Sequence, residues 1–357
     1  MPFQFVDRSG QPEPALRLTE AVVIPKAAID AEVERLAGLP TPANGRRVTA
    51  IVSPDTGVGN GLTHGTAVSI CVLRPGERTQ PIRHNSAQVN FCIRGAGHSV
   101  VGAKRIDFSL YDVWNAPPWT IYQHGNETNE LQVRLTYSNS PLLEKLNIHV
   151  VEDDPAADGR PPAPHQEAAP AHPLGTLPLG EEGALLLPYE KLINPDVVPD
   201  RPLHFPWKQV KQQLDKLTAL GSSYVGRRLY LLYNPATERT NGTTNCHFAT
   251  MCVRPASITD KPHRHTASAI NYYFAGSGNS IVEGKKYLWK AGDLMLTAPG
   301  WAVHRHASDN EDVYELTVQD SPLNIYLGSL LWQEDLSRPL ESLGLTGGFA
   351  TNRPAAA

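Results

Sequence analysis

The sequence lacks the features that mark several large classes of protein. It has 4 cysteines, at positions 71, 92, 246 and 252, and no two of them are spaced as a CxxC pair. Four scattered cysteines give no disulfide framework to a chain of 357 residues, so we expect reduced and mostly buried thiols. No apolar run approaches the ~20 residues needed to span a bilayer. The first residues, MPFQFVDRSG, lack the basic head and apolar core of a secretory signal.

An excess of positive charge is also missing. The chain has 32 basic and 36 acidic residues, which give a formal net charge of -4 at pH 7. A nucleic-acid partner requires a basic patch that this sequence does not offer. The sequence therefore predicts a cytoplasmic protein with neither a nucleic-acid nor a membrane partner. The length favours two domains, and an apolar fraction of 41% is enough to build their cores.

The chain contains one long internal repeat. Residues 22–54 align with residues 203–235 at an offset of 181 positions, and both copies share a proline before a helical stripe and the tripeptide GRR. The stripe consists of Ile29, Val33 and Leu36 in the first copy and of Val210, Leu214 and Leu217 in the second. Each copy is therefore expected to begin with a short helix that opens after a proline.

The match continues toward the end of each copy. The matched pairs include Cys71 with Cys252, Gly95 with Gly276, Asp112 with Asp293, and Trp119 with Trp301. We predict a first domain at 1–151, a linker rich in proline and alanine at 152–198, a second domain at 199–345 and a loose tail at 346–357.

Within each copy, short segments rich in β-branched and aromatic residues alternate with turn residues. HGTAVSICVLRPG and AQVNFCIRGAGHSVVG are two such segments of the first copy, and CHFATMCVRP and AINYYFAGSGNSIVEG are their partners in the second. This spacing predicts an all-β protein of two tandem antiparallel barrels, each with a short helical lead-in.

The second copy carries two pairs of histidines with the spacing HxH. His263 and His265 lie in KPHRHTAS, and His304 and His306 follow in PGWAVHRHAS. Residues two apart on a strand point to the same face, so each pair projects together. A single HxH pair on a surface strand is usually only two polar residues. Two such pairs, separated by glycine turns, indicate a metal site.

The motifs PHRHT, GxG, AGD and APGWAVHRH resemble the paired motifs of the cupin superfamily. The whole chain, with two such domains, resembles the bicupin gentisate/salicylate 1,2-dioxygenase family. The run HRHTASAINYYFAG and the lead-in HFPWKQVKQQLDKL are similar to segments of that family. The glutamate ligand that cupins generally carry shortly after HxH has no counterpart in residues 267–270. The resemblance implies two cupin barrels, which are double-stranded β-helices or jelly rolls.

The resemblance also implies a metal centre at which His263, His265 and His304 bind one iron(II) per chain, with O2 as co-substrate. Three neutral imidazoles leave the iron its full charge and three open positions, which suit a chelating substrate and dioxygen. The same ligands would also accept manganese, nickel, copper or zinc. His306 is then expected to handle the proton of the substrate hydroxyl.

Four residues are candidates for contact with the substrate, namely Asn271, Tyr273, Trp301 and Arg264. Asn271 falls where the family carries an arginine that binds the substrate carboxylate, and asparagine offers neutral hydrogen bonds instead of a charged fork. The substrate therefore either lacks a carboxylate at that place or meets another cation. The candidate cations are Arg264, Arg305, Lys261 and Arg254. Core packing is favoured for Trp301, because the first copy repeats this tryptophan.

The first copy has lost most of the predicted metal site. Ile82 and Tyr122 stand at the first and third ligand positions, whereas His84 and His124 are kept. One ligand out of three does not hold iron well, so we expect a structural or regulatory barrel. The alternative is a different site that uses His84 and His124 with Tyr122 or His98. In the family the iron usually lies in the first barrel, and this chain differs in that respect.

The sequence thus predicts a non-haem iron(II)-dependent dioxygenase that cleaves the ring of a hydroxylated aromatic such as gentisate or a salicylate. One alternative is a three-histidine cupin of other chemistry, such as a thiol or diketone dioxygenase. Another is a non-catalytic bicupin that binds a metal or a small ligand. The family forms homo-oligomers, so a dimer or tetramer is expected.

Overall fold

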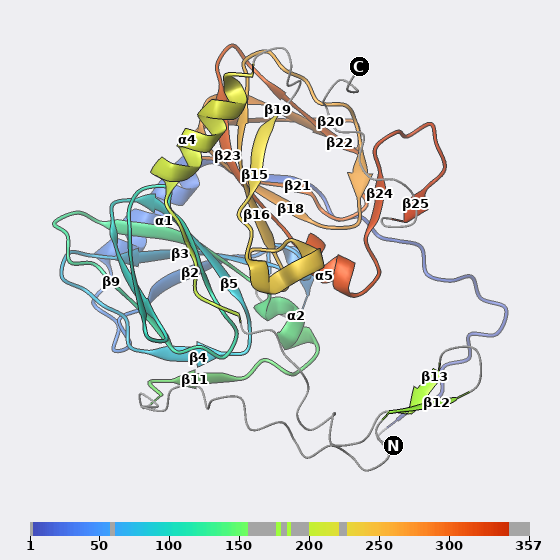
Figure 1. Ribbon diagram of the computed structural model, residues 1–357, viewed down its shortest axis with the longest axis horizontal. Coiled ribbons are helices and arrows are strands. Elements are labelled where there is room, and N and C mark those ends of the chain that lie inside the picture. Colours follow the sequence, from blue (N-terminus) through green and yellow to red (C-terminus); the bar gives the residue numbers. More distant parts are fainter. Residues whose placement is uncertain are drawn as a thin grey trace.

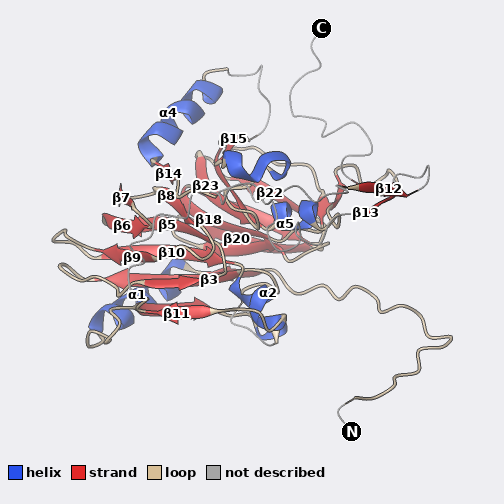
Figure 2. Ribbon diagram, turned by 60° about the horizontal axis from the view of Figure 1, so that its bottom comes forward, coloured by secondary structure: helices blue, strands red, loops and turns tan. Residues whose placement is uncertain are grey.

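The computed structural model describes residues 3–57, 61–155, 176–179, 184–186, 200–220 and 227–342. Most of the predicted linker and the whole predicted tail lie outside these residues. The described chain forms two β barrels side by side, the first blue to green and the second yellow to red in Figure 1. Short helices lie at the edges of the stacked strands (Figure 2). The prediction of an all-β fold with tandem cupin barrels is confirmed.

The first barrel is built from two antiparallel sheets with the strand orders β14-β8-β5-β10-β3-β2 and β11-β4-β9-β6-β7, in which β14 is His204–Phe205. Its elements are α1 (Lys26–Gly38), β2 (Arg47–Ile51), η1 (Pro54–Thr56), β3 (Ala67–Leu73), β4 (Ile82–His84), β5 (Gln88–Arg94), β6 (Gly97–Val101), β7 (Lys104–Phe108), β8 (Val113–Ala116), β9 (Tyr122–Gly125), β10 (Gln132–Ser138), α2 (Ser140–Lys145) and β11 (Val151–Asp153).

The second barrel repeats this plan with the strand orders β1-β21-β18-β23-β16-β15, β20-β19-β22 and β17-β24-β25. Its elements are α4 (Trp207–Thr218), β15 (Arg228–Leu231), η3 (Pro235–Thr240), β16 (Phe248–Arg254), β17 (Arg264–His265), β18 (Ala269–Ala275), β19 (Ser277–Val282), β20 (Lys285–Lys290), β21 (Leu294–Ala298), β22 (His304–Ser308), β23 (Val313–Gln319), α5 (Ser321–Tyr326), β24 (Leu331–Gln333) and β25 (Glu341–Ser342). A separate hairpin pairs β12 (Leu177–Leu179) with β13 (Ala184–Leu186).

The two lead-in segments are exchanged between the barrels. β1 (Val22–Ile24) precedes the first barrel in the chain but pairs with β21 of the second. β14 (His204–Phe205) precedes the second barrel but pairs with β8 of the first. The predicted domain limits place each lead-in with the barrel that follows it, and these limits stay a prediction. The strand pairing shows that each barrel completes its main sheet with a strand from the other copy.

The two predicted lead-in helices are present, and each receives a cap from the opposite barrel. The backbone N–H of Lys26, at the start of α1, donates to Oδ1 of Asp293 at 2.7 Å. The backbone N–H of Trp207, at the start of α4, donates to Oδ1 of Asp112 at 2.7 Å. A carboxylate at a helix N-terminus satisfies a free donor and complements the helix dipole. The matched aspartates of the repeat therefore fasten each helix to the other copy.

The largest apolar core lies between the barrels, where the two six-stranded sheets pack face to face. Phe91 of the first barrel lies 5.7 Å from Tyr272 and 5.9 Å from Phe274 of the second, measured between ring centroids. Ile270, Tyr272 and Phe274 face this seam, whereas Tyr273 belongs to a separate cluster inside the second barrel. Successive side chains of β18 thus point alternately to the apolar seam and to the interior of the second barrel.

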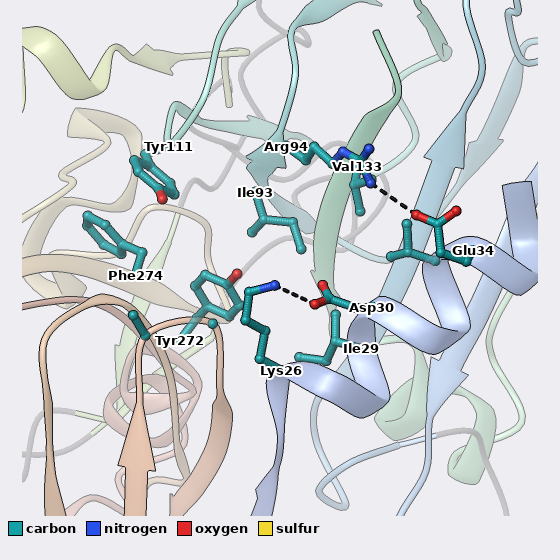
Figure 3. A pocket seen from close by; sticks show the side chains of 13 residues that line it. Lys26, Ile29, Asp30, Glu34, Ile93, Arg94, Tyr111, Val133, Tyr272 and Phe274 are labelled. Atoms are coloured by element: carbon teal, nitrogen blue, oxygen red, sulfur yellow. Dashed lines mark hydrogen bonds and ion pairs between the residues drawn. The ribbon is translucent and has the colours of Figure 1, made fainter.

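A cavity of about 490 Å³ lies in the seam beside α1. Figure 3 shows Lys26 and Asp30 on α1 at one side of it, and Tyr111 and Phe274 at another. The corresponding place beside α4 is filled by the indole of Trp207, the repeat counterpart of Lys26, which lies 5.1 Å from Phe274. The two copies therefore differ in the residue that packs at the start of the lead-in helix, and none of the predicted site residues lines the cavity.

Among the described residues, no helix is both long and apolar enough to cross a lipid bilayer.

One position near the end of each barrel carries a different polar side chain in the two copies. In the second barrel, Oδ1 of buried Asp320 accepts the backbone N–H of Ser268 at 2.7 Å. In the first, Oδ1 of Asn139 accepts the backbone N–H of Ala87 at 2.8 Å. Burial raises the pKa of Asp320 from 3.8 to about 6. The first barrel thus shows that the neutral amide of Asn139 can accept the same backbone hydrogen bond as the carboxylate of Asp320.

We expect Asp320→Asn to change how stability depends on pH. Because the pKa of Asp320 is higher in the folded state, the folded chain binds more protons between pH 4 and 6, and this carboxyl makes the protein less stable as the pH rises through that range. The loss amounts to about 3 kcal/mol. Denaturant unfolding at pH 4.5 and 7 should show a stability gain for Asp320→Asn at pH 7 that is much smaller at pH 4.5. The converse variant Asn139→Asp should lose stability over the same range, and equal effects of Asp320→Asn at both pH values would contradict the prediction.

Candidate metal centre

Three of the predicted histidines converge inside the second barrel. His263 and His304 pair across an isolated bridge, in which the two backbones exchange hydrogen bonds of 3.0 and 2.9 Å. His265 follows two residues after His263 on β17, so its ring turns to the same side. One ring nitrogen of each histidine lies within 4.8 Å of those of the other two. This cluster is the arrangement that the spacing of the two HxH pairs predicts.

Backbone carbonyls fix the orientation of all three rings. Nδ1 of His263 lies 3.1 Å from the carbonyl oxygen of Lys261, Nδ1 of His265 lies 2.7 Å from that of Ala267, and Nδ1 of His304 lies 2.9 Å from that of Ala302. A carbonyl only accepts, so each Nδ1 must carry the proton. Each Nε2 then keeps its lone pair for a metal, which is the usual way in which an outer hydrogen bond prepares a histidine ligand.

Burial keeps the three imidazoles neutral. Desolvation lowers the pKa of His263, lowers that of His265 to about 3 and holds that of His304 well below its usual value. Metal ligation requires neutral imidazole. Among the described residues the cluster includes no carboxylate, so the donor set is three nitrogens. Such a set fits a divalent first-row transition metal and leaves coordination positions open.

His306 lies beside the cluster without joining it. Its ring centroid is 5.6 Å from that of His304, and its Nδ1 lies 2.7 Å from Oγ of Ser280. Ser280 in turn accepts the indole N–H of Trp289 at 2.9 Å. Desolvation holds the pKa of His306 well below its usual value. The ring is thus neutral and oriented from one side, with Nε2 available to a neighbouring group.

Two of the predicted substrate residues face the barrel interior. Asn271 is buried, and its amide donates to Oγ1 of Thr317 at 2.9 Å and accepts from Oγ1 of Thr297 at 2.8 Å. The ring of Tyr273 stacks on that of Trp289, with centroids 3.8 Å apart and planes 4° from parallel. Both side chains are held by neighbours of the same barrel, which gives the interior a fixed wall.

The other two predicted substrate residues pair with each other. The guanidinium of Arg264 lies 4.4 Å from the ring centroid of Trp301, and its Nε donates to Gln333 at 2.7 Å. Arg264 lies between His263 and His265 on the strand and therefore points to the opposite side. The first barrel repeats the pair, with Arg83 4.8 Å from the ring centroid of Trp119. Because both copies contain this arginine–tryptophan contact, packing explains it. The structure does not place the Arg264–Trp301 pair beside the histidine cluster.

The candidate cation Arg254 is already compensated. It is fully buried, and it donates to Asp260 at 2.6 Å and to Glu315 at 3.2 Å. Arg227 lies 3.5 Å from Asp260 and 3.6 Å from Glu315, so two cations and two carboxylates form one cluster. Pairing of this kind offsets the cost of burying charged groups.

Trp332 is a neighbour of the site that none of the sequence motifs indicates. Its ring stacks on that of His265 at 4.7 Å and on that of His263 at 5.5 Å. β24 carries this residue to the site by pairing with β17, where His265 lies opposite Trp332. The first barrel has Val151 opposite His84 at the equivalent place. The signal available in the sequence was this change from valine to tryptophan between the copies.

The four residues of the degenerate first site also lie together. Ile82 pairs with Tyr122 as His263 pairs with His304. Nε2 of His84 lies 2.8 Å from the hydroxyl of Tyr122, which also receives the amide of Gln88 at 3.1 Å. His124 contacts Ser99 at 2.6 Å, as His306 contacts Ser280. The nitrogen of His84 that would bind a metal is thus in contact with a tyrosine hydroxyl, and the loss of a metal from this barrel stays a prediction.

No family model matches this chain. It is 28% identical over 307 residues, covering 82% of this chain and 76% of the relative, to a 5-aminosalicylate 1,2-dioxygenase from Comamonas sp.. It is 27% identical over 286 residues, covering 77% and 68%, to a 1-hydroxy-2-naphthoate 1,2-dioxygenase from Nocardioides sp. (strain KP7). Its fold is similar to that of a salicylate 1,2-dioxygenase from Pseudaminobacter salicylatoxidans, with a TM-score of 0.73, 17% identity and coverage of 91% and 90%.

We expect His265→Ala to abolish tight metal binding, because two of three ligands remain. The matched control is His84→Ala, its repeat counterpart, whose Nε2 contacts Tyr122. The measurement is metal content after anaerobic loading with iron(II) and gel filtration. Wild type and His84→Ala should each retain one metal ion per chain, and His265→Ala should retain almost none. Equal metal content in the two variants would place the metal elsewhere.

Proposed function

The chain belongs to the gentisate/salicylate 1,2-dioxygenase-like family of two-barrel cupins, and we propose that it is an iron(II)-dependent dioxygenase that cleaves the ring of a hydroxylated aromatic compound. The observation that carries the proposal is the cluster of His263, His265 and His304, in which each Nδ1 contacts a carbonyl and each Nε2 has no hydrogen-bond partner among the described residues.

The three histidines would hold one iron(II) per chain. When bound, such an iron supplies open positions for the oxygen atoms of a chelating substrate and for O2, and a path for electron density from the ring to oxygen. The protein contributes the fixed ligand geometry and the absence of a carboxylate ligand. Trp332 stacks on two of the ligand rings and restrains their tilt.

His306 is proposed to take the proton of the substrate hydroxyl. Its neutral state makes it a base, and the contact between its Nδ1 and Ser280 sets the plane of the ring. Asn271 and Tyr273 would form the wall against which the aromatic ring lies. Because Asn271 is neutral and Arg254 is already paired, a substrate carboxylate would be bound by the metal or by uncharged donors here.

The proposed substrate class is a hydroxylated aromatic acid, and the relatives named above act on 5-aminosalicylate and 1-hydroxy-2-naphthoate. Assembly into a homo-oligomer stays a prediction. The predicted cytoplasmic location is supported by the four cysteines, which are all free.

The test is oxygen consumption by the chain loaded anaerobically with iron(II). The panel contains 5-aminosalicylate, gentisate, salicylate, 1-hydroxy-2-naphthoate, a hydroquinone without a carboxylate, a cysteine-like thiol and a diketone. We expect uptake with at least one hydroxylated aromatic acid, ring-opened product by mass spectrometry, and loss of both in His304→Ala. The preferred compound shows whether Asn271 tolerates a carboxylate.

Two results would contradict the proposal. Uptake with cysteine-like thiols or with diketones alone would assign a different three-histidine chemistry. One tightly bound metal per chain without any uptake would assign a non-catalytic binding protein.

The role of His306 has its own test. We expect His306→Gln to lower kcat by about 100-fold or more while the metal content stays at one per chain, because a proton acceptor is lost and no ligand is. The matched control is His124→Gln in the first barrel, which should keep wild-type kcat. An unchanged kcat and pH profile in His306→Gln would exclude the proposed proton transfer.

A further inference from the structure

The interior of the first barrel contains a buried cation with no carboxylate partner. Arg134 lies on β10 and retains only 5% of its exposure. Its Nη1 donates to Oε1 of Gln132 at 3.1 Å, which is its one hydrogen bond to the described residues. Its Nε is buried without an acceptor there. None of the ion pairs among the described residues includes Arg134, so its charge is not neutralised by them.

Comparison of the two copies shows that a cation at this position occurs only in the first barrel and is not a shared feature of the fold. Arg134 lies opposite Cys71 and Cys92 in the sheet. The equivalent residue of the second barrel, opposite Cys252 and Tyr273, is Glu315.

The partner of Glu315 has changed as well. In the second barrel, Arg254 donates to Glu315. At the repeat position of Arg254, 181 residues earlier, the first barrel has Leu73. One copy therefore has a balanced pair, whereas the other has a single positive charge at the same depth.

Three further donors point into the same interior without an acceptor among the described residues. They are Nδ2 of Asn90, Nε1 of Trp114 and Nε2 of Gln132. Asn90 lies between Trp114 and Thr136 in the sheet, and Thr136 is two residues from Arg134 on β10. In the second barrel the counterparts of Trp114 and Gln132 are Met295 and Val313, and Asn271, the counterpart of Asn90, has both ends of its amide paired. At these three matched positions, the second barrel therefore has no unpaired donor among the described residues.

Buried donors without acceptors and a buried charge without a counter-charge are both strongly unfavourable. A small monoanion removes both costs, because it accepts several hydrogen bonds and neutralises a guanidinium. We propose that the first barrel binds one small monoanion, a carboxylate or a halide, through Arg134, with one or more of Asn90, Trp114 and Gln132 as additional donors. The degenerate barrel is thereby a second ligand site, separate from the metal centre and independent of the proposed dioxygenase activity.

The test measures thermal unfolding of the full chain without metal, in the His265→Ala background so that anions cannot bind at a metal. Chloride, formate and benzoate are titrated at constant ionic strength against sodium sulfate. We expect Tm to rise by about 2–3 °C at a tenfold excess over Kd for at least one of the three anions. A response to benzoate identifies an aromatic carboxylate as the occupant, and a response limited to chloride and formate identifies a smaller anion.

Substitutions then locate the site. Arg134→Met, in the same background, should lose the response, because the flexible apolar side chain keeps the volume and removes the charge. Arg94→Gln is the matched control, since Arg94 lies on a neighbouring strand of the same barrel but pairs with Glu34 at the surface, and it should keep the full response. Equal Tm shifts with and without Arg134, or no anion-specific shift at all, would overturn the proposal.

A second measurement does not depend on the folding of Arg134→Met. Crystals of the wild-type chain soaked in bromide should show an anomalous peak within hydrogen-bond distance of the Arg134 guanidinium. Bromide peaks on the surface but none inside the first barrel would overturn the proposal. Arg134→Lys, which keeps the charge but loses the fork, should respond to anions more weakly than the parent chain.

Discussion

The strict alternation of side chains along the central strands is the constraint on which the rest of this molecule depends. Each six-stranded sheet must present one apolar face to the other barrel, because the largest core of the protein lies between them. The opposite face is then free to be polar and lines the barrel interior. On β18, Ile270 and Tyr272 pack in the seam while Asn271 and Tyr273 face inward. A slip of one residue would exchange these sets, so the seam fixes the register that positions the site.

The internal repeat separates what the fold requires from what the site requires. Features found in both copies have structural explanations: the aspartate caps on α1 and α4, the stacked pairs Arg83–Trp119 and Arg264–Trp301, and the serine contacts of His124 and His306. Several of the features found in only one copy lie around the barrel interiors. The second barrel has two histidines where the first has isoleucine and tyrosine, and Trp332 where the first has Val151. Positions that differ between the two copies are therefore the better guide to functional residues, because the positions that are the same in both copies are mostly explained by packing.

The repeat, the all-β class and the three-histidine cluster were predictable from the sequence, because each depends on local spacing or on motifs that recur. The exchange of β1 and β14 was not, since the sequence does not show which barrel a short lead-in strand joins. Trp332 was missed for the same reason: its contact with His265 arises from pairing between β17 and β24, which are distant in the chain. The predicted role of Arg264 overlooked that a residue between two inward histidines faces outward. Contacts that depend on pairing between strands distant in the chain thus could not be predicted from the single sequence.

Charge balance links the two interiors to their proposed ligands. Near the histidines, the positive charges of Arg227 and Arg254 are offset by Asp260 and Glu315, so this cluster adds no unbalanced charge to the site. A divalent metal on three neutral imidazoles adds two positive charges that no free carboxylate among the described residues of this cluster can offset. An anionic chelating substrate supplies that missing charge, whereas a neutral ligand leaves it uncompensated in a poorly solvated space. The interior of the first barrel also carries an unbalanced positive charge, because Arg134 lies at the position where the second barrel has Glu315. Both proposals thus give an interior that favours an anion, one through the metal that three histidines would hold and the other through Arg134.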